Sequence, residues 1–222
     1  MKTVAFVPIK LNNERFPGKN VRSFTNGEPL ISYILNTLLN VENVDERYVY
    51  CSSEDIIPYL PEGIHFLKRD PYYDLSSTPF NEVLTSFAEL VEADVYVLSH
   101  ATAPFMSAQS ISLGVDKVIK ENYDCALAVN KLQEFIWKDG QPFNYRAESI
   151  PRTQDLAPMY TETCGLYVYT RDVILGKRRR IGDRPYLIEV SKTEACDINT
   201  KDDFVIADAI FQAMFCNNQY NR

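Results

Sequence analysis

Short apolar runs and amphipathic stretches alternate along the first 130 residues of the chain. The short runs have the length of strands buried on both faces, at 4–9, 47–51, 64–67, 94–98 and 124–129. The first run alone is too short to exclude a helix, but the repeated pattern favours strands. Helices are predicted between them, at 30–40, at 79–92 and from 107 onward. This alternation predicts an α/β fold with a doubly wound, mostly parallel sheet.

The alternation of apolar runs and amphipathic stretches stops over residues 131–160, which have no helical period. Asp139-Gly140 is a typical hairpin turn, so this segment is expected to leave the sheet. It is rich in large aromatic side chains, which are costly to leave in water: Phe135, Trp137, Phe143 and Tyr145. We therefore predict that residues 131–160 form a dimerisation arm. A hairpin folded back on its own domain is the alternative.

The chain returns to regular structure with a strand predicted at 163–169. The segment 188–196 then leads to Asp197-Ile198-Asn199-Thr200. A last helix is predicted to begin near Lys201, because Asp202 and Asp203 place negative charge in its first turn. We expect one domain over residues 1–222.

Composition excludes several classes of protein. With 45% apolar and 24% charged residues, the chain resembles an ordinary globular protein, and no run is long enough to span a membrane. The N-terminus lacks a signal-peptide pattern, and five scattered cysteines form no Cys-x-x-Cys pair. These features predict a cytoplasmic protein without a disulfide framework or a zinc site. The net charge of −7 argues against nucleic-acid or anionic-membrane partners.

A basic loop follows the first predicted strand and carries Lys10, Arg15, Lys19 and Arg22. Ligands of open α/β sheets bind beyond the carboxyl ends of the strands. A local basic loop on an acidic chain therefore predicts a site for a small anion, with a solvated loop as the alternative. The loop is not a P-loop, because Asn13 occupies the place of its first glycine and Asn20 follows the lysine. The dinucleotide pattern Gly-x-Gly-x-x-Gly is absent as well.

Five blocks of the sequence, in order, are similar to motifs of one enzyme family. Residues 15–20 read Arg-Phe-Pro-Gly-Lys-Asn, which resembles the opening signature of the acylneuraminate cytidylyltransferase (CMP-sialic acid synthetase) family. Before this block, Lys10 takes an arginine place, Leu11 and Asn12 take two glycine places, and Glu14 takes a lysine place. The other blocks lie at 99–105, with Thr102 and Pro104 matching, and at 154–162, 197–200 and 203–204.

The resemblance implies a three-layer Rossmann-like nucleotidyltransferase fold and a homodimer. It implies transfer from CTP to an acidic, sialic acid-like sugar, with Mg²⁺ as cofactor and pyrophosphate as product. By position, it gives catalytic roles to Lys10, Arg15 and Lys19, and nucleotide binding to Pro8, Leu11, Asn12, Asn20, Ser52 and Arg69. It gives sugar binding to His100, Thr102, Arg152, Gln154, Tyr160 and Glu162, and metal binding to Asp197 and Asn199.

Several of these residues have an alternative role. One carboxylate beside the phosphates can suffice for Mg²⁺, which makes Asp197 the better metal candidate. Asn199 stands where the family has a second aspartate, and it either assists the metal or caps the last helix with Thr200. His100 replaces a sugar-contacting glutamine of the family, so we favour sugar binding over a general-base or a purely structural role.

Three interpretations concern the structural setting of single residues or runs. Arg69 is placed either near the nucleotide or on the solvated surface. The run 177–180, Lys-Arg-Arg-Arg, is interpreted as a solvent-facing loop. Cys164 lies where the family commonly has glycine, and we expect a small core residue.

Two other functions stay open on the sequence alone. The lost glycine pair, Glu14 and Asn199 are compatible with a nucleotide-binding relative that has no catalytic activity. A nucleotidylyltransferase that uses a different nucleotide or sugar is the second alternative.

Overall fold

The structure is a computed structural model that describes residues 1–216. Its strands are β1 (Thr3–Ile9), β2 (Glu46–Cys51), β3 (His65–Lys68), β4 (Val95–Ser99), β5 (Cys125–Leu132), β6 (Trp137–Lys138), β7 (Gln141–Pro142), β8 (Met159–Thr170) and β9 (Pro185–Glu189). Its α-helices are α1 (Leu30–Leu39), α2 (Phe80–Leu90), α3 (Ala108–Lys120) and α4 (Lys201–Phe211). Short 3₁₀ or π turns are η1 (Lys19–Val21), η2 (Glu54–Tyr59), η3 (Pro71–Asp74), η4 (Thr153–Asp155), η5 (Asp172–Gly176) and η6 (Gln212–Cys216).

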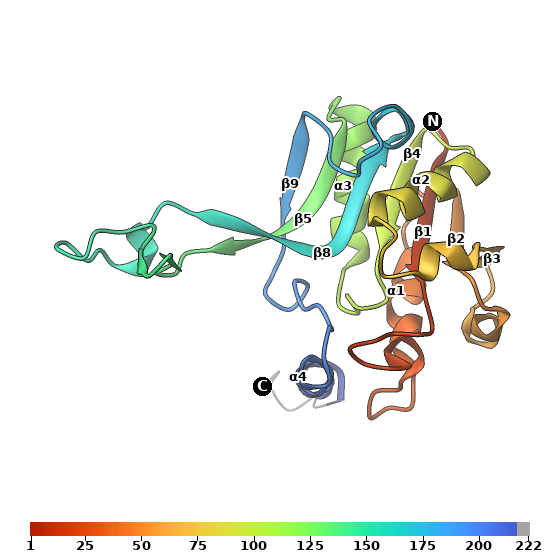
Figure 1. The fold of residues 1–222 in the computed structure, drawn as a ribbon, viewed down its shortest axis with the longest axis horizontal. Coiled ribbons are helices and arrows are strands. Elements are labelled where there is room, and N and C mark those ends of the chain that lie inside the picture. Colours follow the sequence, from red (N-terminus) through yellow and green to blue (C-terminus); the bar gives the residue numbers. More distant parts are fainter. Residues whose placement is uncertain (217–222) are drawn as a thin grey trace.

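Seven strands form one sheet in the order β3-β2-β1-β4-β8-β5-β9 (Figure 1). The pairs β1–β2, β1–β4, β2–β3 and β5–β9 are parallel, whereas β8 runs antiparallel to both of its neighbours. The predicted mostly parallel α/β sheet is therefore confirmed. The strand predicted at 163–169 is longer than expected, because β8 begins at Met159 and continues into the arm.

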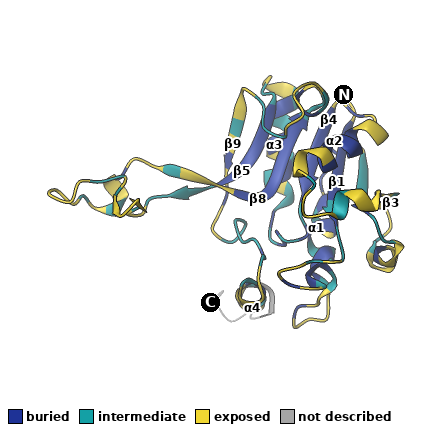
Figure 2. Cartoon of the chain, viewed as in Figure 1, coloured by how far each residue is buried: buried dark blue, intermediate teal, exposed yellow. Residues whose placement is uncertain are grey.

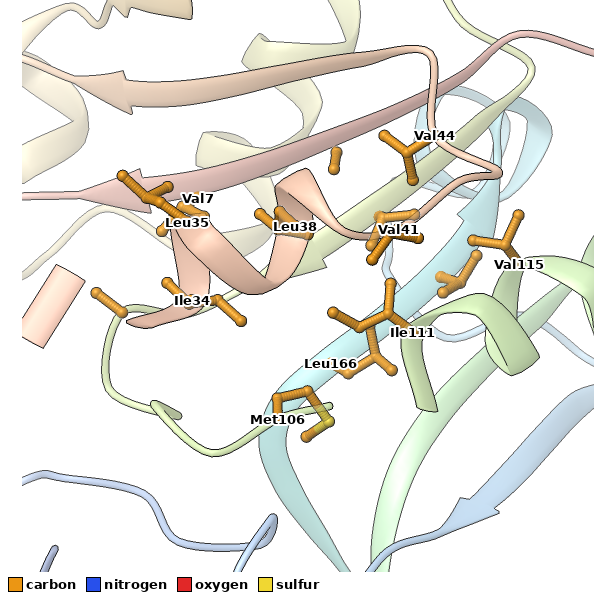
Figure 3. Close-up of a cluster of buried hydrophobic side chains, with 14 of the residues drawn as sticks. Val7, Ile34, Leu35, Leu38, Val41, Val44, Met106, Ile111, Val115 and Leu166 are labelled. Atoms are coloured by element: carbon orange, nitrogen blue, oxygen red, sulfur yellow. The ribbon is translucent and has the colours of Figure 1, made fainter. Parts of the chain in front are cut away.

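Helices cover both faces of the sheet. Along β1, Ala5, Val7 and Ile9 belong to the core under α1 and α3, which Figure 3 shows around Val7 and Leu35. Val4 and Phe6 belong to the opposite core, where α2 and η5 pack. Successive residues of a strand point to opposite faces, so a wholly apolar β1 can be buried on both sides. This arrangement confirms the three-layer Rossmann-like fold.

A third apolar cluster joins the loop after β1 to the C-terminal helix α4. Phe16 and Phe24, from the loop after β1, pack against Phe204 and Phe211 of α4. The rings of Phe24 and Phe204 lie 5.0 Å apart, centroid to centroid. Helix α4 begins with a capping box, in which Thr200 and Asp203 exchange hydrogen bonds. The cluster therefore places the segment before α4 beside the basic loop, although the two are about 180 residues apart.

Residues 131–160 form a long arm that projects from the body of the molecule (Figures 1 and 2). The end of β5 and the start of β8 form its stem, and the hairpin β6–β7 lies beyond it. Asp139 and Gly140 both have positive φ, as a two-residue hairpin turn requires, so the predicted hairpin is confirmed. The alternative of a hairpin folded back on its own domain is wrong. Dimerisation through the arm stays a prediction.

Within residues 1–216, no helix is both long enough and apolar enough to cross a membrane.

Candidate active site

A cavity of about 420 Å³ opens at the carboxyl ends of β1 and β4. Six separate stretches of the chain line it: Pro8 to Asn20, Phe80, His100 to Thr102, Cys164, Arg180, and Asp197 with Asn199. This is the edge where open α/β sheets bind ligands. Nine of the predicted site residues line the cavity: Pro8, Lys10, Arg15, Lys19, Asn20, His100, Thr102, Asp197 and Asn199.

Hydrogen bonds of the Ile198 peptide connect three of these stretches: the loop after β1, the loop after β4 and the segment before α4. Its N–H donates to the carbonyl oxygen of Thr102 over 2.9 Å. Its own carbonyl oxygen accepts a 2.8 Å hydrogen bond from the Lys19 ammonium. Because Ile198 is fully buried, these bonds fix the loop after β1 and the loop after β4 relative to the segment before α4.

Lys19 and its neighbours place buried polar groups at the cavity, and several of these groups have no hydrogen-bond partner within the described chain. Lys19 is 8% exposed, and burial lowers the pKa of its ammonium, an effect that the nearby Asp197 carboxylate partly offsets. Asn20 donates to the carbonyl oxygen of Lys10 over 3.2 Å. Within the described chain, buried oxygens of Asn13 and Asn20 and Nε2 of His100 have no hydrogen-bond partner. Buried polar atoms are normally paired, so these point to a polar ligand.

Asp197, Asn199 and Arg15 form a chain of hydrogen bonds along one wall. Arg15 donates to Oδ1 of Asn199 over 2.8 Å, and Nδ2 of Asn199 donates to Asp197 over 2.6 Å. Thr200, rather than the Asn199 side chain, caps α4. The capping alternative is therefore confirmed for Thr200 and wrong for the Asn199 side chain, which donates to Asp197.

His100 directly follows β4 and is half-buried, with its Nε2 shielded from solvent and its ring 5.6 Å from that of Phe80. Burial lowers the pKa of His100 to about 4, and the positive charge of Arg180 acts in the same direction. The imidazole is therefore neutral at neutral pH. A neutral ring can accept or donate one hydrogen bond to a ligand, as the predicted binding role requires.

Cys164 is exposed and lines the cavity, so its expected place in the core is wrong. The reason is an irregularity in β8: Leu127 of β5 pairs with Tyr167, but Val129 pairs with Glu162. The extra residues of β8 form a bulge, in which Cys164 adopts φ of 57°. Such bulges turn side chains toward a new direction and are frequent beside active sites. Glycine, the family residue, would adopt this conformation at lower cost.

Arg180 also lines the cavity, although the run 177–180 is otherwise exposed as expected. Its guanidinium lies 3.9 Å from the centroid of the Tyr167 ring and forms a 3.4 Å ion pair with Glu162. The hydroxyl of Tyr167 donates to the same Glu162 carboxylate over 2.5 Å. We call Glu162, Cys164, Tyr167 and Arg180 the bulge cluster.

A smaller cavity of about 270 Å³ adjoins the first and shares Pro8, Lys10 and Phe80 with it. Arg69 lines this cavity and is only 3% exposed, so a solvated surface position is excluded. It donates to the carbonyl oxygen of Ile9 and to Asp74, and Ser52 donates to the other Asp74 oxygen. Lys10 donates to the Asp74 carbonyl oxygen over 3.2 Å.

The remaining predicted residues lie outside both cavities. Arg152, Gln154 and Tyr160 belong to the arm, where Arg152 forms an ion pair with Asp155. Leu11 packs against the core under α1, and Asn12 is exposed. Glu162 reaches the cavity only through its contact with Arg180.

Sequence reasoning missed five lining residues: Asn13, Phe80, Ala101, Cys164 and Arg180. Asn13 lies within the basic loop and Phe80 starts a helix at the ligand-binding edge, so position along the chain could have indicated both. The bulge that brings Cys164 and Tyr167 beside Arg180 has no signal in a single sequence, because it depends on the register between β5 and β8.

A three-layer α/β fold with a basic cavity at the carboxyl ends of its strands is typical of nucleotide-binding proteins. Residues 4–206 match the cytidylyltransferase family, and the chain belongs to that family. The resemblance inferred from the sequence is therefore confirmed at the level of the family.

Curated relatives are distant in sequence. An N-acylneuraminate cytidylyltransferase of Streptococcus agalactiae serotype V is 19% identical over 92% of this chain and 52% of its own length. The chain thus spans about half the length of this relative. The pseudaminic acid cytidylyltransferase of Campylobacter jejuni is 22% identical over 96% of this chain and 97% of its own.

Among solved structures, the chain is similar to a CMP:2-keto-3-deoxy-manno-octonic acid synthetase complexed with CTP. The TM-score is 0.70 at 16% identity, over 96% of this chain and 99% of the other. At this identity the similarity establishes the fold.

Proposed function

We propose that the protein is a CTP-dependent cytidylyltransferase that joins CMP to an acidic, sialic acid-like sugar and releases pyrophosphate. The observation that carries this proposal is the charge of the larger cavity. In the described part of the chain, four basic side chains line it, Lys10, Arg15, Lys19 and Arg180, against the single carboxylate of Asp197. On a chain with a net charge of −7, such a concentration of positive charge is suited to a polyanionic ligand.

The two adjoining cavities suggest how CTP would lie. The triphosphate would occupy the larger cavity, beside Arg15 and the partly desolvated Lys19. The cytosine base would occupy the smaller cavity, which Arg69 and Tyr73 line. Pro8 and Lys10 belong to both cavities and would lie near the junction of base and phosphates. Ser52 would act indirectly, by holding the Asp74 carboxylate that also binds Arg69.

The residues around Asp197 fit a magnesium ion that is completed by substrate. Within the described chain, no group of three or more acidic, histidine or cysteine side chains could hold a metal alone. Mg²⁺ is commonly held by one or two carboxylates with substrate phosphates and water. Asp197 would supply the carboxylate. Asn199 donates to Asp197 through Nδ2, and its Oδ1, which accepts from Arg15, would have to turn toward the ion to serve as a neutral ligand. The ion would neutralise phosphate charge when bound.

The chain's own residues would carry the reaction by placement and charge. A sugar hydroxyl attacks the α-phosphorus and gives up its proton to solvent. A new P–O bond forms, and the bond from the α-phosphorus to the oxygen that bridges to the β-phosphorus breaks to release pyrophosphate. Phosphoryl transfer of this kind depends mainly on positioning and electrostatic stabilisation. Lys10, Arg15 and Lys19 would stabilise the developing charge. His100 and Thr102 would contact the sugar.

The test is pyrophosphate release from each of the four nucleoside triphosphates with Mg²⁺. The acceptors are N-acetylneuraminate, pseudaminic acid and 3-deoxy-manno-octulosonate. We expect pyrophosphate release with CTP and at least one of the acids. Of the four nucleotides, we expect CTP and no other to stabilise the protein against heating. Stabilisation by CTP without release from any acid would favour the non-catalytic relative that Leu11, Asn12 and Asn199 leave open. Stabilisation by none of the four nucleotides would contradict the proposal.

We further propose that the arm is a dimerisation element of the single domain. Its support is the exposure of apolar side chains along residues 131–160: Trp137 is 61% exposed, Phe143 53% and Ile150 67%. Exposed apolar groups of this size are usually covered by a partner. A partner's arm could bring Arg152, Gln154 and Tyr160 to the sugar end of the cavity, which they do not reach in their own chain.

Sedimentation at micromolar concentration tests the dimer, and mixing variants tests the shared site. Arg152→Ala and Lys19→Ala should each be nearly inactive alone. Mixed dimers should regain part of the activity, because one of their two sites then has both residues. A monomer in sedimentation would contradict the dimer. A dimer without complementation would confine each site to one chain.

A further inference from the structure

Among residues 1–216, Arg180 is the one basic residue of the cavity that does not come from the loop after β1. It follows η5 and lies over β8, where Phe80 and Tyr167 flank its guanidinium at 5.9 and 3.9 Å from the ring centroids. Lys10, Arg15 and Lys19 contact Asp74, Asn199 and Ile198 instead. The cavity therefore has two separately built cationic walls. Lys19 and its neighbours already provide one of them for the phosphates.

The geometry around Arg180 leaves the edge of its guanidinium available for a ligand. The Tyr167 ring covers one face of the group, which fixes its plane by a cation–π contact. Within the described chain, Glu162 is the carboxylate that pairs with it, through Nη2 over 3.4 Å. A guanidinium has five N–H donors in a planar fork, so donors remain for a second planar acceptor.

Glu162 and Tyr167 stand on either side of the bulge in β8 and are joined by their 2.5 Å hydrogen bond. Burial and this hydrogen bond raise the pKa of Tyr167, so its hydroxyl stays neutral and continues to donate. The bulge thus forms a rigid base for Arg180 and turns Cys164 into the same end of the cavity. Phe80 and the neutral His100 complete this end.

We propose that Arg180, held by Tyr167 and Glu162, binds the carboxylate of the acceptor sugar and thereby selects acidic over neutral acceptors. The inference rests on the proposed function and deepens it. A planar carboxylate matches two parallel N–H donors of a guanidinium, and such bidentate pairs add geometric selectivity. The rings of Phe80 and His100 and the thiol of Cys164 would lie against the body of the sugar. Glu162 is then a positioning residue rather than a direct sugar ligand.

The test compares each active sugar acid with its methyl ester, which keeps the sugar but removes the negative charge. The acceptor is the acid that gives the fastest pyrophosphate release with wild-type protein, and the readout is the ratio of kcat/KM for acid over ester. We expect a wild-type ratio of about 100, because a hydrogen-bonded ion pair is worth that factor. Arg180→Gln should lower the ratio to about 1, and the KM for CTP should stay unchanged.

Two further variants sharpen the comparison. Arg180→Lys keeps the charge but loses the fork and the stack on Tyr167, so an intermediate ratio of about 10 is expected. Arg178→Gln removes the same charge from an exposed position of the same loop and should leave the ratio at its wild-type value.

The outcomes separate this inference from the proposed function. A purely structural role of Arg180 would lower kcat/KM for acid and ester equally and leave their ratio at 100, which would overturn the inference. A role in phosphate binding would raise the KM for CTP without changing the ratio, and would also overturn it. Absence of release with any acid and CTP would instead refute the proposed function.

Discussion

The wall formed by residues 8–20 with 197–199 is held by hydrogen bonds, two of them to main-chain oxygens. The bulge cluster is held by side chains alone, through a ring contact, an ion pair and the Tyr167–Glu162 hydrogen bond. On the first wall, Lys19 binds the carbonyl of Ile198 and Asn20 binds the carbonyl of Lys10. On the second, Arg180 lies on Tyr167 and pairs with Glu162. The first wall therefore depends on backbone placement and tolerates few changes. The second depends on side-chain identity, so under our proposal we expect substitutions there to change the acceptor while the fold is kept.

The difference also concerns charge. The first wall combines three basic side chains with Asp197, which suits phosphates and a hard cation. The second combines one arginine with aromatic rings and a neutral imidazole. This difference agrees with our proposal that a triphosphate lies at one wall and a monoanionic sugar at the other. Four predictions test this division, beginning with the largest expected effect.

Asp197→Asn should lower Mg²⁺-dependent pyrophosphate release by about 1000-fold, because charge stabilisation at a phosphoryl group is worth several kcal/mol. Asn199→Asp should preserve or raise the activity, since it adds a second carboxylate beside the first. The measurement is initial velocity across a Mg²⁺ titration, with Asp202→Asn in the exposed first turn of α4 as control. Wild-type velocity in Asp197→Asn at every Mg²⁺ concentration would contradict the metal assignment.

Lys19→Ala should weaken CTP binding by about 100-fold without unfolding the protein. The variant lacks the buried ammonium that is proposed to contact the triphosphate. Calorimetric titration of CTP measures the effect, and a thermal scan checks the fold. Lys192→Ala, whose side chain is 85% exposed, is the matched control. Unchanged CTP affinity in Lys19→Ala would remove the first wall from the nucleotide site.

The sequence predicted much of the first wall because its residues fall in two short segments, each of which carries a recognisable motif. Segment 15–20 and segment 197–200 can each be recognised as short motifs, and the apolar pattern of β1 places the first at the ligand-binding edge. The strand and helix pattern likewise predicted the sheet. The second wall depends on long-range geometry, because Phe80, Cys164 and Arg180 meet only through packing and a shifted register between β5 and β8. A lysine-arginine run such as 177–180 is usually solvated, and here three of its four residues are exposed.

The third prediction concerns His100 and stability at acidic pH. Because burial lowers the pKa of His100 to about 4, the folded state resists protonation while the unfolded chain takes up a proton near pH 6.5. Stability should therefore fall as pH drops from about 6.5 to 4. The neighbouring Arg180 and Lys19 act in the same direction, and Asp197 opposes them.

His100→Gln removes this titration, so the pH dependence of the free energy of unfolding should decrease by about 2 kcal/mol between pH 7 and pH 5. Urea denaturation at several pH values measures it. His65→Gln changes the exposed histidine and serves as control. An identical pH dependence in wild type and His100→Gln would show that His100 is accessible to protons in the folded protein.

The smallest expected effect is at Cys164, a residue of the second wall whose backbone has the left-handed conformation that favours glycine. A residue with a Cβ at φ of 57° is strained by about 1 kcal/mol relative to glycine. Glycine also loses more conformational freedom on folding, which offsets part of the gain. Cys164→Gly should therefore stabilise the protein by at most about 1 kcal/mol, whereas Cys164→Ala, which keeps the Cβ, should not.

Both variants remove the thiol from the cavity. A change in sugar selectivity that is common to the two variants would therefore be caused by loss of the thiol. A change in stability found only in the glycine variant would report the bulge. Equal stability of the two variants would mean that the left-handed conformation of residue 164 is not a source of strain.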